Sequence, residues 1–256
     1  MRPAAALAAC AILAACATGG GPAPGTVLPG YLTEATISRA VEATGDTALV
    51  EPAFHPPEPG DDRWWLAIAH AELRPPEAAQ HFDCALGTRL TQKRRPALER
   101  LMGRLLADAE AFTREAARRH GHEPRPIARN PRLLPCQRVT PALRDSPSWP
   151  AGGAVAGTLY GEAVAAAAPD RATQARWIGA ALGASRVVCR MNSERDVEAG
   201  ERGAALLYPM IAATPDYQAD LEGARAEIAA ARAEALSNPS CAAERRALGP
   251  MPGEDR

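Results

Sequence analysis

Residues 183–197 read GASRVVCRMNSERDV. Ser185 and Arg186 stand near the start of this stretch, and Asp196 stands near its end. Asn192 lies four residues before the aspartate, where a base or a nucleophile could be paired with a carboxylate. A serine, an arginine and an aspartate so close together indicate a functional site. The asparagine between them raises the question whether this site still performs chemistry.

Two other segments of the chain contain groups that suit an anion. Arg118 and Arg125 are separated by six residues, and residues 150–153 read PAGG at the start of a small-residue helix. Arginine offers planar sets of donors to phosphate oxygens, and a glycine-rich helix start presents backbone N–H groups. The three segments together predict an oxyanion pocket. The alternative, in a chain this rich in arginine, is a solvated charged face.

The order and spacing of these segments resemble the class A bacterial non-specific acid phosphatases, in the type-2 phosphatidic acid phosphatase/vanadium haloperoxidase superfamily. The family signature is Lys-x6-Arg-Pro, then Pro-Ser-Gly-His, then Ser-Arg-x5-His-x3-Asp. The matching residues here are Arg118-x6-Arg125-Pro126, Pro150-Ala151-Gly152-Gly153, and Ser185-Arg186-x5-Asn192-x3-Asp196. Flanking stretches such as RWWLAIAHAEL, HFDCALG and RDVEAG are also similar, so the likeness covers about residues 29–237. It implies a single all-α domain, a helical bundle of the acid phosphatase/haloperoxidase type.

The resemblance also implies a role for each matched position. In such phosphatases a histidine at the position of Asn192 attacks phosphorus, and the aspartate, here Asp196, orients it. A histidine at the position of Gly153 protonates the leaving oxygen. The positions that bind the phosphoryl oxygens, without a metal or a cofactor, are Arg118, Arg125, Ala151, Gly152, Ser185 and Arg186.

The positions that depart from the signature include both catalytic histidines. The amide nitrogen of Asn192 is not a usable nucleophile, and losing the nucleophile of a covalent mechanism lowers kcat by about 10⁶. Gly153 cannot protonate a leaving group, and Ala151 lacks the serine hydroxyl. Arg118 keeps the charge of the family's lysine. No catalytic residue is therefore intact, and the leading hypothesis is a pseudoenzyme that binds phosphate or a phosphorylated small molecule.

Two other functions remain open at this point. One is a weak acid phosphomonoesterase that works through a different nucleophile, for which His120 and His122 are the nearest candidates in the sequence. The other is a structural or partner-binding envelope protein with a vestigial pocket and an unidentified protein partner.

The first residues have the features of an exported lipoprotein. Arg2 precedes a short apolar run that ends in Leu-Ala-Ala-Cys at residues 13–16, which resembles a bacterial lipobox. We expect a signal peptide over 1–15, a lipid on Cys16 and a flexible tether over 16–30. Ala17 favours the outer membrane, facing the periplasm. The alternative is an ordinary signal peptide with an incidental cysteine.

Composition excludes several other kinds of partner. The net charge is −1, which gives no electrostatic case for nucleic acid, and we expect membrane contact through the lipid anchor alone. No Cys-x-x-Cys motif is present, and His120-x-His122 lacks further ligands, so we expect no metal.

Four cysteines follow the signal region, namely Cys84, Cys136, Cys189 and Cys241. An even number in an exported chain favours two disulfides. The resemblance implies a Cys136–Cys189 bridge, which leaves Cys84–Cys241 as the second pair, although four cysteines also allow other pairings.

Apolar periodicity predicts helices and no strands. Residues 31–62 are a Pro-rich N-terminal segment, 63–240 the helical domain, and 241–256 a C-terminal tail. Within the domain, residues 122–150 contain seven prolines and are expected to form a long structured loop. The expected helices cover residues 64–73, 76–86, 96–120, 154–168, 170–185, 193–213 and 214–236.

Overall fold

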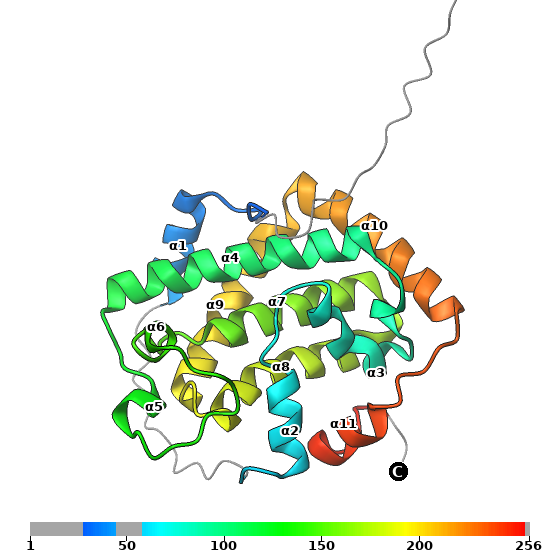
Figure 1. The fold of residues 1–256 in the computed structure, drawn as a ribbon. Helices are drawn as coiled ribbons and strands as arrows, with labels where there is room; N and C mark the ends of the chain where they lie inside the picture. Colours follow the sequence, from blue (N-terminus) through cyan, green and yellow to red (C-terminus); the bar gives the residue numbers. More distant parts are fainter. Residues whose placement is uncertain (1–27, 45–57, 254–256) are drawn as a thin grey trace, which may run out of the picture.

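The computed structural model describes residues 28–44 and 58–253, and within them the regular structure is helical, without strands (Figure 1). The prediction of an all-α fold is therefore confirmed. The predicted signal peptide and the predicted lipidation site at Cys16 lie outside the described residues. The longer helices are α1 (Glu34–Thr44), α2 (Asp62–Ala69), α4 (Pro96–His120), α7 (Gly152–Ala167), α8 (Ala172–Val188), α9 (Glu194–Ala212), α10 (Pro215–Ala233) and α11 (Cys241–Leu248).

Helices α7 and α8 form the centre of the molecule. They are neighbours in sequence and pack along each other, and α7 also contacts α4, α9 and α10 (Figure 1). Small residues make this close packing possible: a Cβ atom added at Gly157 would lie 2.6 Å from the carbonyl oxygen of Gly179. Because the pair is antiparallel, the start of α7 lies beside the end of α8.

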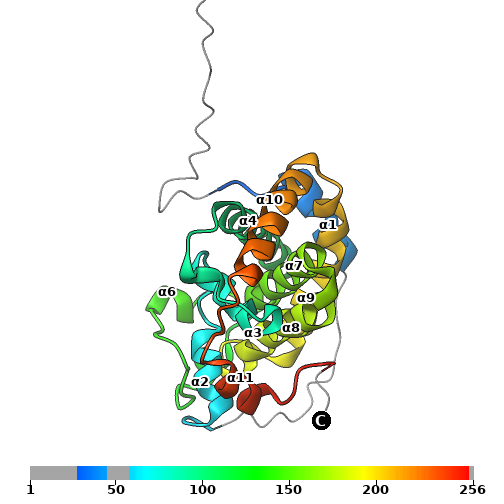
Figure 2. The ribbon, with the colours of Figure 1, turned by 90° about the vertical axis from the view of Figure 1, so that its right-hand side faces the viewer.

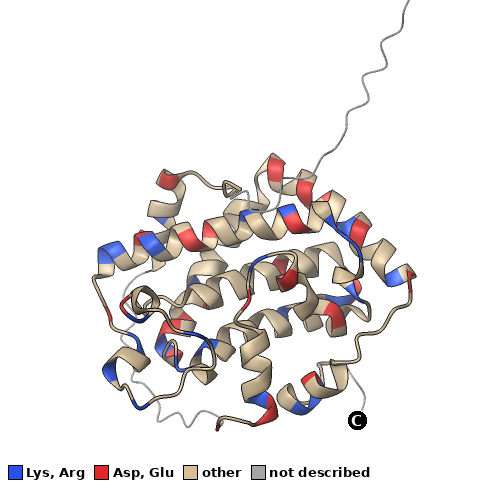
Figure 3. Cartoon of the chain, viewed as in Figure 1, with Lys and Arg blue, Asp and Glu red and all other residues tan. Residues whose placement is uncertain are grey.

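Helix α4 spans the residues that its periodicity predicts. Pro96 occupies the first turn, and the buried residues that face the core include Leu101, Leu105 and Phe112. The helix ends at His120 because Gly121 follows with a φ of +98°, which suits glycine. Along α4, positive and negative side chains are interspersed (Figure 3).

The starts of α9 and α10 agree with the predicted helices over 193–213 and 214–236, and each is capped by a hydroxyl side chain. Ser193 caps α9, and its side chain accepts a hydrogen bond from the Asp196 backbone N–H while the Asp196 carboxylate accepts one from the Ser193 backbone N–H. Thr214 caps α10 through the backbone N–H of Tyr217. This capping fixes Asp196 in the first turn of α9.

Other elements differ in extent from the expectations. Helix α2 ends at Ala69, with His70 as its C-cap residue, and not at residue 73. The expected helix over 76–86 is divided into the 3-10 helix η1 (Glu77–Phe82) and the short α3 (Asp83–Leu86). The 122–150 loop contains two one-turn helices, α5 (Pro126–Arg129) and α6 (Pro141–Arg144). Short 3-10 helices also occupy Leu90–Gln92 (η2) and Pro169–Arg171 (η3).

Both disulfides join the predicted partners. Cys136–Cys189 has a Cα–Cα distance of 4.7 Å and attaches the 122–150 loop to the end of α8. Cys84–Cys241 has a Cα–Cα distance of 5.5 Å and attaches the start of α11 to α3. The segment expected to be a tail thus contains α11, which packs against α2 (Figure 2). No described helix is long and apolar enough to cross a membrane.

Candidate functional site

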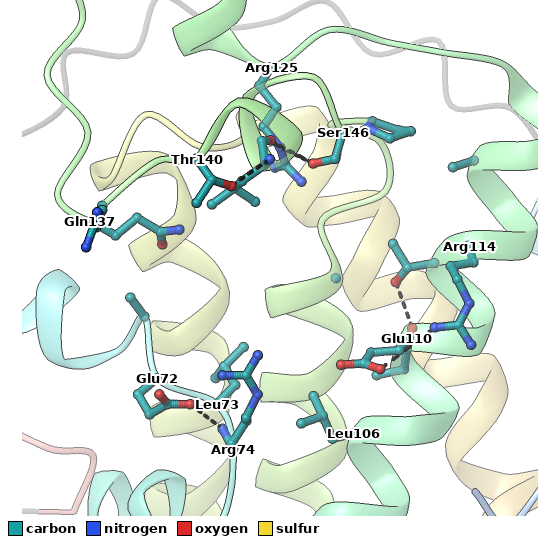
Figure 4. A pocket seen from close by; sticks show the side chains of 18 of the residues that line it. Glu72, Leu73, Arg74, Leu106, Glu110, Arg114, Arg125, Gln137, Thr140 and Ser146 are labelled. Atoms are coloured by element: carbon teal, nitrogen blue, oxygen red, sulfur yellow. Dashed lines mark hydrogen bonds and ion pairs between the residues drawn. The ribbon is translucent and has the colours of Figure 1, made fainter. Parts of the chain in front are cut away.

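A cavity of about 1090 Å³ opens between α4, the segment that follows α2, and the 122–150 loop (Figure 4). Its apolar wall includes Ile68, Leu73 and Leu106. Polar side chains surround the rest of it: Glu72, Arg74, Glu110, Thr113, Arg114, Arg118, His122, Arg125, Gln137, Arg138, Thr140 and Ser146. Gly152, at the start of α7, also lines the cavity. The cavity therefore brings together Arg118 and Arg125 with Gly152 of the PAGG segment.

Arg118 and Arg125 differ in what they contact. Arg118 is exposed at the cavity rim, and its guanidinium donates to both carboxylate oxygens of Glu115 at 2.8 Å. Arg125 is half-buried and donates to the carbonyl oxygen of Met191 at 2.9 Å and to Ser146 Oγ at 3.1 Å. Burial lowers the pKa of Arg125, an effect that the charge of Asp196 opposes. Arg125 is thus the better placed of the two to hold an anion inside the cavity.

Arg186 lies directly behind the cavity wall. It is 9% exposed, and its Nη1 donates to Gln137 Oε1 at 2.9 Å. Burial, and then the positive charge of Arg125, lower the pKa of Arg186 to about 10. Arg186 remains charged at neutral pH, so its guanidinium and that of Arg125 repel each other.

The start of α7 lies next to Arg186. Ala151, the N-cap residue, is buried, gives no side-chain cap and donates its own N–H to the Asp196 carbonyl oxygen at 2.8 Å. A Cβ atom at Gly153 would lie 2.6 Å from Arg186 Cδ, so the glycine leaves room for the arginine side chain. The positive end of the α7 dipole and the Arg186 side chain therefore adjoin each other.

Asn192 and Asp196 do not bond to each other through the carboxylate. Asn192 Nδ2 donates to the Ser148 carbonyl oxygen at 2.6 Å. Asp196 Oδ2 accepts from Ser148 Oγ at 2.6 Å and from the Ser193 backbone at 2.7 Å. Asp196 Oδ1 is buried and has no hydrogen-bond partner among the described residues. A buried carboxylate oxygen without a donor is costly and unusual.

Ser185 lies apart from the cavity. Its hydroxyl contacts Arg63 Nη1 at 2.9 Å and His70 Nδ1 at 2.8 Å, and it donates to the Ala181 carbonyl oxygen. Burial, and then the charges of His81 and Arg63, lower the pKa of His70 well below its usual range. Ser185 therefore belongs to a buried polar cluster between α8 and α2, and the structure does not bring it together with the cavity.

The remaining histidines have separate surroundings. His122 is exposed and lines the cavity, whereas His120 stacks on the Trp149 ring with 4.2 Å between ring centroids. Across residues 28–44 and 58–253, no group of three or more His, Cys, Asp or Glu side chains could hold a metal ion.

Several polar residues around the site were not identified from the sequence. Ser148 holds both Asn192 and Asp196, and Gln137 holds Arg186. The sequence did contain one signal for Gln137. This residue follows Cys136, and the predicted Cys136–Cys189 bridge places Gln137 near the end of α8.

Comparison with known proteins bears on what this site is. No family model matches the chain. The non-specific acid phosphatase of Salmonella typhimurium strain LT2 is 25% identical over 169 residues, which cover 66% of this chain and 68% of that protein. The non-specific acid phosphatase of Salmonella typhi matches with the same identity and coverage. The acid phosphatase of Zymomonas mobilis is 28% identical over 176 residues, which cover 69% of this chain and 66% of that protein.

These relatives support an acid phosphatase family. The acid phosphatase-like chain carries guanidinium groups and a helix N-terminus at its site, while Gly153 and Asn192 occupy the two positions where the family signature has histidine. The site thus combines groups suited to holding an anion with the absence of the two side chains that the signature uses to break a phosphoester bond.

Proposed function

We propose that the protein is an acid phosphatase-like pseudoenzyme of the cell envelope that binds phosphate or a phosphorylated small molecule without hydrolysing it. The observation that carries this proposal is the pair Arg125 and Arg186. Neither guanidinium forms an ion pair within the described part of the chain, although one is buried and the other half-buried. Charged groups removed from water without an ion-pair partner are unfavourable. The Asp196 carboxylate acts on Arg125 without forming an ion pair with it, and a bound oxyanion would supply a direct partner to both guanidinium groups.

The position of the two arginines supports phosphate in particular. Arg186 adjoins the start of α7, whose backbone N–H groups and dipole favour an anion. Arg125 lies on the cavity side, so an anion there would receive donors from more than one direction. The 1090 Å³ cavity leaves room for an organic group attached to the phosphate.

The loss of catalysis is argued from two positions. Asn192 donates its amide to Ser148, and an amide nitrogen has no available lone pair to attack phosphorus. Gly153 has no side chain to protonate a leaving group. A purified sample assayed with an aryl phosphate from pH 4 to 7 (roughly the range in which a histidine nucleophile and acid would titrate) is expected to show no turnover above the protein-free rate.

The rival enzyme hypothesis makes a different prediction in the same assay. Because His122 lines the cavity, turnover that persists in Asn192→Ala and disappears in His122→Ala would establish a phosphomonoesterase with a different nucleophile. That result would overturn the pseudoenzyme proposal.

Phosphate binding itself is tested by calorimetric titration. We expect Arg186→Ala to weaken phosphate binding about 10- to 100-fold, since a hydrogen bond to a charged group contributes about 1.5–3 kcal/mol. Arg132→Ala is the control, because Arg132 is an exposed arginine of the 122–150 loop that does not line the cavity. Thermal unfolding of both variants checks that they fold. Equal affinities in the two variants would overturn phosphate binding at Arg186. No binding by the wild type would favour the third hypothesis, a partner-binding protein with a vestigial pocket.

The proposal places the protein at the outer membrane, facing the periplasm and anchored through Cys16. Cell fractionation tests this part: the full chain is expected with the membranes, and Cys16→Ser is expected to lose lipid and leave the membrane fraction. Retention of the variant would contradict lipid anchoring at this residue.

A further inference from the structure

We infer that Gln137 is a gate that separates Arg186 from the cavity, so that a ligand reaches this arginine only after the Gln137 side chain has moved. The inference rests on the proposed binding of phosphate at this site and adds how access to that site is controlled.

The contact between the two side chains supports the gate. Gln137 Oε1 accepts the hydrogen bond from Arg186 Nη1 at 2.9 Å, which is the kind of contact that a phosphoryl oxygen would make. Gln137 lines the cavity, whereas Arg186 does not, although the two side chains touch. Figure 4 shows the Gln137 side chain extending from the loop toward the cavity, on the same side as Arg125. The carboxamide oxygen thus takes a donor that an anion would use.

The backbone that carries Gln137 is tied to the helix that carries Arg186. Cys136 is bonded to Cys189, and Cys189 follows Arg186 by about one helical turn, with its backbone N–H donating to the Ser185 carbonyl oxygen. The disulfide therefore restrains the backbone of Gln137 beside the end of the helix that carries Arg186. Opening of the gate is then a rotation of the Gln137 side chain, which has free volume on its cavity side.

The gate has consequences for affinity and for ligand class. A neutral carboxamide is a weaker acceptor than a doubly charged phosphate, so phosphate displaces it, but part of the binding free energy is lost in the exchange. A ligand with a dianionic phosphomonoester group competes better for Arg186 than a singly charged or neutral one. The site thereby selects for phosphomonoesters even though the cavity is large.

Titration with inorganic phosphate tests the gate in Gln137→Ala and Gln137→Glu. We expect Gln137→Ala to bind about tenfold tighter than the wild type, because the competing acceptor is gone. Gln137→Glu has nearly the same shape but places a carboxylate on Arg186, and it is expected to lose measurable phosphate binding. In an Arg186→Met background, Gln137→Ala should leave the affinity unchanged. Thermal unfolding shows whether each variant folds.

The outcomes separate the gate from the underlying proposal. Wild-type binding that is unchanged in Gln137→Ala overturns the gate and leaves phosphate binding intact, and weaker binding by Gln137→Ala would make Gln137 a ligand-binding residue instead. Binding by Gln137→Ala in the absence of measurable wild-type binding would support the gate. No binding by any chain overturns both.

Discussion

At the scale of single residues, Asp196 has two structural roles that do not depend on catalysis: it contacts Ser148, and it caps helix α9. Its Oδ2 atom accepts hydrogen bonds from Ser148 and from the backbone of Ser193, so it completes the cap of α9. A cap of this kind contributes about 1 kcal/mol, which gives a structural reason for an aspartate here whether or not the protein is an enzyme. The unpaired Oδ1 atom is the part of the residue that capping does not explain. The family signature has a histidine at the position of Asn192, four residues before this aspartate.

Gly153 is the residue whose replacement disturbs the site most directly. In Gly153→Ala the new Cβ atom would lie 2.6 Å from Arg186 Cδ, so the buried arginine must shift. We expect phosphate affinity to fall about tenfold and the free energy of unfolding to fall by about 1–3 kcal/mol, as in other overpacked sites. Calorimetry and urea denaturation measure the two effects.

The neighbouring glycine provides the control for this prediction. In Gly152→Ala the new Cβ atom meets the Thr113 hydroxyl at 3.2 Å, a milder contact with the end of a side chain. Smaller changes in both quantities are expected. Unchanged phosphate affinity in Gly153→Ala would mean that Arg186 does not contribute to binding. The same crowding implies that restoring histidine at 153 must displace Arg186, so a simple reversal to the family signature is expected to leave the site inactive.

At the scale of elements, the sequence predicts the long helices well and the short ones poorly. Helix α4 buries eight apolar side chains and has a proline in its first turn and a glycine after its end, so each signal agrees with the others. Helices α5 and α6 have four residues each, too few for periodicity to appear. Gln137 and Ser148 lie in the 122–150 loop that contains α5 and α6, and their contacts depend on how this loop folds over α8 and α9. The candidate arginines of the site could be predicted from motif spacing, whereas the contacts of Gln137 with Arg186 and of Ser148 with Asn192 and Asp196 could not.

Glu244, on helix α11, is expected to make the stability of the protein depend on pH. Burial, and then the charge of Asp83, raise the pKa of Glu244 to about 7 from an ordinary value of 4.5. The folded protein therefore keeps this proton at pH values where the unfolded chain has released it. The contribution of Glu244 to the free energy of unfolding is expected to be largest below about pH 4.5 and to be lost as the pH rises through about 7. Asp108, whose pKa burial raises to about 6, acts in the same direction.

Glu244→Gln tests this dependence because it removes the proton without changing the shape of the side chain. We expect the loss of stability between pH 5 and pH 8, measured by urea denaturation, to be smaller in the variant by about 1–2 kcal/mol, after allowance for partial exposure. Glu222→Gln on α10 is the control, since the Glu222 side chain is exposed and no change is expected. The Cys84–Cys241 disulfide keeps α11 attached throughout. An identical pH dependence in Glu244→Gln would contradict the prediction.

At the scale of the whole molecule, the α7–α8 pair connects the core to the site. The start of α7 provides Gly152 and Gly153, and the last turns of α8 provide Arg186 and Cys189. The spacing between the two helices therefore sets the distance from the α7 N-terminus to the Arg186 side chain. That spacing depends on glycines in mid-helix, which the sequence presents as a small-residue pattern without indicating what they pack against.

Gly179→Ala is expected to disturb both stability and binding, although residue 179 does not line the cavity. The added Cβ atom would lie 2.6 Å from the Gly157 carbonyl oxygen and 3.0 Å from Gly161 Cα, and because both are backbone atoms the helices must separate. We expect the free energy of unfolding to fall by about 1–3 kcal/mol and phosphate binding to weaken. Gly103→Ala on α4 is the matched control, since its Cβ atom meets Leu28 Cδ1 at an ordinary 3.4 Å. There alanine is expected to stabilise the helix by up to about 1 kcal/mol. If Gly179→Ala lowers stability while phosphate affinity stays at the wild-type value, the two helix ends hold their positions independently of the packing between the helices.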